Sequence, residues 1–210
     1  MDKLEEIKFI ISNNEIEKVE RLLELSNDND EEVRFRAIGA LYPFSDKKGV
    51  FDRVRDAIKD SDSLVRVESI GLLGDWQDVS SVLQIIESLS DDDWLVRASA
   101  AISLGKIGDK KAISAIEAKL ESVSYDEELL RYYIALSCLG KNQYLRKVLD
   151  QLSNPYYRVR CAVANLLLEC LEYLDSENFV EDFKKALEKA LEKEETKAAR
   201  SSIVNAIQNI

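Results

Sequence analysis

The chain has 210 residues, of which 46% are hydrophobic and 33% are charged. Its formal net charge of −11 disfavours contact with phosphate backbones, so we expect no nucleic-acid partner, and a basic protein is the easier partner. The sequence contains no histidine, which excludes Ser-His-Asp and Cys-His catalysis and the common zinc and iron sites.

Short helices are predicted along the whole chain, because apolar residues recur at helical spacing and only 7 glycines and 2 prolines interrupt them. An amphipathic helix over residues 2–12 is predicted to cap the N-terminal end, since an end repeat needs one polar outer face. From Glu15 onward the helices are predicted to pair. The expected first helices span 15–25, 50–58, 79–89, 112–123, 144–152 and 176–193. The expected second helices contain 33–41, 65–74, 96–108, 129–140, 159–167 and 199–207.

The second helices share a signature that is most complete over residues 91–108, Asp-Asp-Asp-Trp-Leu-Val-Arg-Ala-Ser-Ala-Ala-Ile-Ser-Leu-Gly-Lys-Ile-Gly. Its opening aspartates predict an N-cap. The small side chains of Ala100 and Ala101 predict close approach of a neighbouring helix. Gly105 and Gly108 predict a left-handed C-terminal stop.

Each signature contains an arginine, and the spacing of about 30 residues is typical of a helix-pair solenoid. These arginines are Arg34, Arg66, Arg97, Arg131, Arg160 and Arg200. Asp30 and Asp62 stand four residues before Arg34 and Arg66, which predicts i,i+4 pairs that link stacked repeats as a ladder. Direct ligand contact by the arginines is the alternative. In the fourth signature the pattern slips by one residue, so we expect either an overwound helix or an interrupted ladder.

The pattern Val-Arg-x-x-Ala-Ala-x-x-Leu-Gly-x-Ile-Gly, preceded by Asp, resembles the HEAT-like repeats of the phycobilin-lyase type. Residues 96–108 match it almost fully, 65–74 and 33–41 match well, and the later copies match in part. The resemblance implies an all-α fold: a right-handed α-solenoid of about six HEAT-like helix pairs with an N-terminal capping helix. We expect one domain over residues 1–210.

Similar repeats occur in phycobilin lyases, deoxyhypusine hydroxylases, HEAT-like DNA glycosylases, toxin-neutralising bacterial proteins and scaffolds, so the resemblance predicts the fold and leaves the function open. The hydroxylases bind iron through His-Glu pairs, which a chain without histidine cannot carry. Cys138, Cys161 and Cys170 form no close-spaced metal motif, and their odd number without an export signal predicts reduced thiols in the cytoplasm. We expect no cofactor, no metal and no membrane contact.

We therefore expect a cytoplasmic, monomeric module that is not an enzyme and binds another protein on the concave face, which the second helices line. Outward positions there carry aromatic and arginine side chains, which are typical interface anchors. The candidate protein-binding residues are Phe35, Arg36, Glu68, Trp94, Tyr132, Tyr133, Tyr156, Tyr157 and Arg158. Packing between repeats, or docking on the loops at Tyr125 and Tyr156, are the alternatives.

Two kinds of function remain open at this point. A bacterial immunity protein that neutralises a toxin is a specific version of the protein-binding module. The alternative is a lyase or chaperone-like protein that acts on a chromophore or small ligand.

Overall fold

The computed structural model describes residues 2–13, 18–174 and 179–210. These residues form thirteen α-helices, joined by turns and short 3-10 helices, and they contain no β-strand. The predicted all-α fold is confirmed. No helix in the described part of the chain is both long enough and apolar enough to cross a membrane.

The chain divides into two compact units, residues 1–103 and 104–210, and the boundary falls inside α7 (Trp94–Ile107). Each unit is described by itself. The single domain expected over residues 1–210 stays a prediction.

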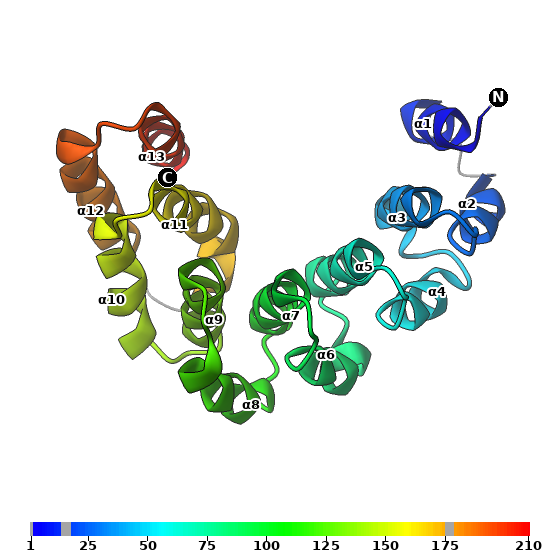
Figure 1. Ribbon diagram of the computed structural model, residues 1–210, viewed down its shortest axis with the longest axis horizontal. Coiled ribbons are helices and arrows are strands. Elements are labelled where there is room, and N and C mark those ends of the chain that lie inside the picture. Colours follow the sequence, from blue (N-terminus) through cyan, green and yellow to red (C-terminus); the bar gives the residue numbers. More distant parts are fainter. Residues whose placement is uncertain (1, 14–17, 175–178) are drawn as a thin grey trace. The chain divides into compact units, whose positions relative to one another are not determined.

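Unit 1 contains the N-terminal helix and the first signatures. Its helices are α1 (Lys3–Asn13), α2 (Val19–Leu25), α3 (Glu31–Ala40), η2 (Tyr42–Phe44), α4 (Val50–Ala57), α5 (Ser63–Asp75), η3 (Val79–Ser81), α6 (Val82–Ser88) and the first part of α7. Helix α3 packs against α1, α2 and α5, and α4 packs against α5 (Figure 1). The helix expected at 15–25 is described from Lys18 onward, because residues 14–17 lie outside the described residues.

Unit 2 continues the same alternation. Its helices are the end of α7, then α8 (Ala112–Lys119), η4 (Leu120–Ser122), α9 (Asp126–Cys138), α10 (Gln143–Asp150), η5 (Gln151–Ser153), α11 (Tyr157–Cys170), η6 (Leu171–Tyr173), α12 (Phe179–Lys193) and α13 (Lys197–Asn209). Helix α11 packs between α9 and α13, while α10 packs against α9 and α12 packs against α13 (Figure 1). The expected helix at 176–193 is described from Phe179, since residues 175–178 lie outside the described residues.

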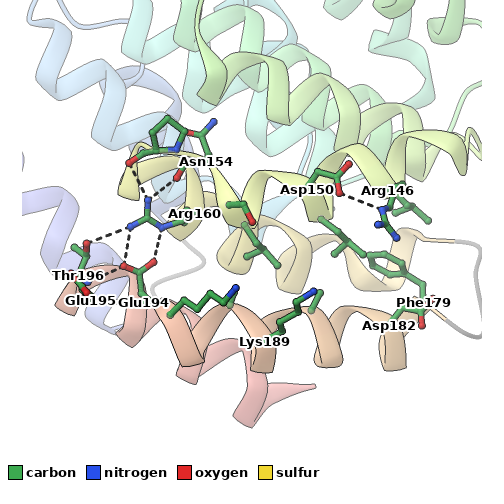
Figure 2. A pocket seen from close by; sticks show the side chains of 18 of the residues that line it. Arg146, Asp150, Asn154, Arg160, Phe179, Asp182, Lys189, Glu194, Glu195 and Thr196 are labelled. Carbon is green, nitrogen blue, oxygen red and sulfur yellow. Dashed lines mark hydrogen bonds and ion pairs between the residues drawn. The ribbon is translucent and has the colours of Figure 1, made fainter.

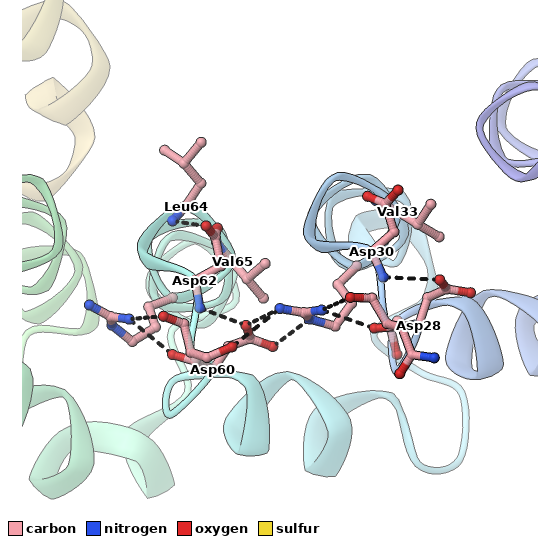
Figure 3. Close-up of polar contacts among 12 residues, drawn as sticks. Asp28, Asp30, Val33, Asp60, Asp62, Leu64 and Val65 are labelled. Atoms are coloured by element: carbon pink, nitrogen blue, oxygen red, sulfur yellow. Dashed lines mark hydrogen bonds and ion pairs between the residues drawn. The ribbon is translucent and has the colours of Figure 1, made fainter.

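Aspartates fix the starts of the signature helices, as the sequence predicts. The Asp30 carboxylate accepts from the backbone N–H groups of Glu32 and Val33 at 2.9 and 3.4 Å. The Asp62 carboxylate accepts from Leu64 and Val65 at 3.0 and 3.1 Å (Figure 3). These bonds satisfy N–H groups that have no partner inside the helix.

The two glycines predicted to stop α7 have different roles. Gly108 has φ of 78°, the left-handed conformation of a helix stop, as predicted. Gly105 instead lies within α7, where an added Cβ would be 2.9 Å from the Cα of Ala135. Gly74 holds the equivalent place in α5, where an added Cβ would be 2.8 Å from the Cα of Ser103. These glycines let successive signature helices approach closely, and the buried Ala100 has the small side chain expected at such a contact.

Candidate functional site

The signature arginines join neighbouring repeats through bidentate ion pairs, and we call this series of pairs the arginine ladder. Arg34 donates from Nε and Nη2 to the Asp60 carboxylate at 2.9 and 2.8 Å. Arg66 binds the Asp91 carboxylate at the same two distances. Parallel N–H···O bonds of this kind fix geometry as well as adding energy. The predicted link between repeats is confirmed.

The partners in the ladder differ from the predicted ones. Asp62, four residues before Arg66, caps α5, while Asp60, six residues before Arg66, belongs to the ladder. Asp60 serves two repeats, since its carboxylate binds Arg34 and its backbone oxygen accepts from Arg66 Nη1 at 2.9 Å (Figure 3). We call the residue at this position the acceptor residue. The prediction that each arginine pairs with the aspartate four residues before it is therefore wrong.

Unit 2 contains another such link. Arg160 binds the Glu194 carboxylate at 2.6 and 2.9 Å, and the backbone oxygen of Glu194 accepts from Arg200 Nη1 at 2.7 Å. The Glu194 side chain is only 4% exposed. Its hydrogen bonds from Arg160 lower the pKa of Glu194 to about 2. The carboxylate is therefore charged throughout the neutral range.

The fourth signature interrupts the ladder. Tyr125 occupies the acceptor position, and Arg131 donates to the backbone oxygen of Glu127 at 2.9 Å. Burial lowers the pKa of Arg131. Helix α9 is a continuous α-helix. Of the two predicted alternatives, the structure therefore has the interrupted ladder and not the overwound helix. The side chain of Tyr132 is 0% exposed, which corrects its assignment to an outward binding face, because the slipped register turns it into the core.

The predicted binding residues of unit 1 lie on α3, α5 and α7. Arg36 is exposed, pairs with Glu32 at 2.8 Å and lies 5.2 Å from the centroid of the Phe35 ring. Glu68 is half-buried, and burial, with Asp75 adding to the effect, raises its pKa. Trp94 is half-buried at the start of α7. Their role in binding stays a prediction.

Tyr133 does not lie where an outward position was expected. Its ring stacks on Tyr144 of α10 at a centroid distance of 5.6 Å, and Lys147 lies 5.2 Å from the Tyr133 centroid. Tyr144 reaches Glu117 of α8 at 3.5 Å. Tyr133 thus packs between α9 and α10, because the slip of one residue turns it toward the first helices of the pairs.

Exposed aromatic residues gather where α9 and α11 begin. Tyr125, Tyr156 and Tyr157 are 55%, 66% and 41% exposed. A hydrogen bond of 3.0 Å between Asn154 and Asp126 joins the two loops that carry them. Arg158 is exposed beside Tyr157, whose hydroxyl group raises the pKa of that arginine. We call Tyr125, Tyr156, Tyr157 and Arg158 the aromatic edge.

A cavity of about 1170 Å³, which was not predicted from the sequence, lies in unit 2 between α10, η5 and α12 (Figure 2). Its apolar lining comes from both helices. These residues are Leu145, Leu149, Leu152, Phe179, Ala186 and Ala190. The Arg160–Glu194 pair and Thr196 close one end (Figure 2). Ala186 and Ala190 are too small to fill the space toward α10, which leaves it open.

Charged side chains of both signs surround this cavity. Arg146 and Asp150 of α10 form an exposed pair at 3.3 Å, and α12 contributes Asp182, Lys189 and Lys193. The lining as a whole is balanced in charge, with Arg146, Arg160, Lys189 and Lys193 against Asp150, Asp182, Glu194 and Glu195. The Glu and Lys spacing over residues 181–197 predicts a solvated helix face with i,i+4 pairs, of which Lys185–Glu181 at 3.3 Å is one.

Within residues 2–13, 18–174 and 179–210, no group of three or more histidine, cysteine, aspartate or glutamate side chains is placed to hold a metal ion. The expected lack of cofactors stays a prediction.

Comparison with known proteins identifies the repeat. Residues 51–137 match the family described as HEAT repeats. This segment is built of HEAT repeats. The match covers α4 to the last turn of α9 and so includes signatures from both units. No curated protein matches the chain by sequence.

Two solved structures are similar to most of the chain. The complex of CpcE and CpcF of phycocyanin lyase from Nostoc sp. PCC7120 is 19% identical, with a TM-score of 0.55 over 90% of this chain and 93% of that chain. Human deoxyhypusine hydroxylase in complex with glycerol is 19% identical, with a TM-score of 0.53 over 92% and 85%. Likeness at this identity shows the fold, and it confirms the predicted HEAT-like α-solenoid.

The same structures correct the expectation that the chain is not an enzyme. One is a lyase and the other a hydroxylase, so two enzymes have this fold. The lack of histidine excludes only those reactions that need a histidine side chain. A solenoid of this type is therefore compatible with catalysis.

Proposed function

We propose that this chain is a lyase- or chaperone-like HEAT-repeat protein that acts on a chromophore or other small ligand and docks a partner protein on the aromatic edge. The aromatic edge is the observation that carries the proposal. Tyrosine and arginine are enriched among residues that dominate binding energy, and exposed rings grouped with an arginine are typical of a docking surface.

The fold supports the lyase-like part. Phycocyanin lyase shares the fold over nearly the full length of both chains, and it was solved as a complex of two proteins. A ligand-handling role with a partner chain is consistent with both facts. A basic partner, a monomeric state when the protein is free and a role as an immunity protein stay predictions from charge and resemblance.

Affinity capture of the tagged chain from its native host tests the docking surface. We expect the wild type to capture one protein. The double variant Tyr156→Ala/Tyr157→Ala should capture it about 30-fold more weakly, because an anchor residue contributes about 2 kcal/mol or more to binding. Tyr42→Ala is the matched control, since Tyr42 is 54% exposed in unit 1, outside the aromatic edge. Equal capture by all three proteins would place the docking surface elsewhere.

Mass spectrometry of the same captured material tests the ligand-handling part. We expect a small molecule or chromophore to be retained by the wild-type chain or its complex. If the captured protein is present and no small molecule is retained under native conditions, the lyase-like part is rejected while the docking surface stands.

A further inference from the structure

We infer that the cavity between α10 and α12 is a binding site for a small anionic ligand with an apolar body. The inference deepens the proposed function by naming the class of ligand and the place where it binds. It is carried by the shape and lining of the cavity, independently of the aromatic edge.

The apolar part of such a ligand fits the lining. Ligand pockets are commonly about 300–1,000 Å³, so a cavity of about 1170 Å³ accepts a molecule of drug size or larger. Leu149, Ala186 and Ala190 are half-buried, so each presents part of its apolar surface to the open space. An apolar body that covers these side chains removes them from water, which favours binding.

The anionic part fits two lysines of α12. Lys189 and Lys193 are four residues apart, and therefore lie on the same side of the helix. Both are exposed lining residues, and within the described part of the chain no carboxylate lies within ion-pair distance of either one. Figure 2 shows Lys189 over the opening between the helices. The two ammonium groups offer a carboxylate, sulfonate or phosphate its counter-charge.

The surrounding charges favour this end of the cavity for an anion. Arg160 beyond Lys193 is already neutralised by Glu194, and Arg146 on the opposite rim is held only by an exposed pair with Asp150. The chain carries a net charge of −11, so most of its surface repels an anion, whereas the lining of the cavity is balanced. Asp182, seven residues before Lys189, lies about 10 Å along the helix from it. Glu195 is the carboxylate added at the lysine end, so Lys189 and Lys193 together still leave that end cationic.

The test uses 8-anilinonaphthalene-1-sulfonate, an anionic aromatic dye, with the whole purified chain. We expect saturable fluorescence enhancement at one site. Lys189→Glu should weaken binding about tenfold, because an attraction is replaced by a repulsion at close range. Lys185→Glu is the matched control, since the same charge change on α12 affects an exposed residue that pairs with Glu181 outside the cavity. We expect the control to bind within about twofold of wild type.

Two further measurements separate the cavity from general charge effects. Ala190→Leu should weaken binding of the dye without a change of charge, because the larger side chain occupies the space between the helices. The neutral analogue 1-anilinonaphthalene should bind at least tenfold more weakly than the sulfonate. Equal effects of Lys189→Glu and Lys185→Glu, unchanged binding by Ala190→Leu, or equal affinity for the neutral dye would each overturn the inference.

Failure here is distinguishable from failure of the proposed docking surface. Tyr156→Ala/Tyr157→Ala should bind the dye as wild type does, because neither tyrosine lines the cavity. Loss of dye binding in that variant would contradict the separation of the two sites.

Discussion

Two glycines of α5 predict opposite outcomes for the same substitution. An added Cβ at Gly71 meets no atom within 4 Å, whereas at Gly74 it would be 2.6 Å from Ser103 Oγ and 2.8 Å from Ser103 Cα. Gly71→Ala should stabilise the protein by about 0.5–1 kcal/mol, because alanine loses less conformational freedom on forming a helix. Gly74→Ala has the same favourable conformational term, but overpacking against Ser103 lowers the stability by about 1–3 kcal/mol.

The Gly74 change also disturbs a hydrogen bond. Ser103 Oγ donates to the backbone oxygen of Ile70 at 2.9 Å, and its loss adds about 1 kcal/mol. We therefore expect Gly74→Ala to destabilise the protein by about 2 kcal/mol, so the two variants differ by about 3 kcal/mol. The assay is urea unfolding followed by tryptophan fluorescence, which reports on unit 1 because both tryptophans, Trp76 and Trp94, lie there. Equal midpoints for the two variants would refute the close contact of α5 with α7.

Three other outcomes follow from the packing and the arginine ladder. Ala100→Leu should destabilise unit 1 by about 1–3 kcal/mol by overpacking, and an unchanged fluorescence midpoint would remove Ala100 from the helix contact. Tyr132→Ala should lower stability by about 3–5 kcal/mol in unfolding followed by circular dichroism, while a near-native melt would return this residue to the surface. Glu194 has a pKa of about 2 in the fold, below the ~4.3 of an unfolded chain, so its stabilisation is present above about pH 4.3 and is lost as the pH falls toward 2. The stability deficit of Glu194→Gln, measured by urea unfolding from pH 7 to pH 3, should therefore be largest at neutral pH, and a deficit independent of pH would contradict the role of its charge.

The repeat could be predicted from the sequence because each second helix carries its own cap, apolar stripe and small residues. Such signals are local, so the aspartate caps at the helix starts and the small buried residue Ala100 could be predicted. The carboxylate partners of the arginines were not predicted, because Asp60 and Arg34 are 26 residues apart in the sequence and meet only when repeats stack. The acidic residue six positions before each of Arg34, Arg66 and Arg200 was a signal that could have suggested them.

The site was harder to predict than the fold. A slip of one residue in α9 rotates each side chain by about 100°, which moved Tyr132 into the core and Tyr133 against Tyr144. Tyr156 and Tyr157 are exposed, and their place at the edge of a binding surface stays a prediction. The cavity depends on what Ala186 and Ala190 fail to fill between two helices, and no property of one helix reveals that space.

The acceptor residue gives two successive junctions between the early repeats the same ion pair. Arg34 and Arg66 are 32 positions apart, and each donates the same pair of hydrogen bonds to an aspartate of the next repeat at the same distances. A repeat duplicated or deleted in register would keep the same arginine–aspartate contact at each of these junctions. At the fourth repeat the acceptor position holds Tyr125, which has no carboxylate, so this position cannot form the ion pair that Asp60 and Asp91 form.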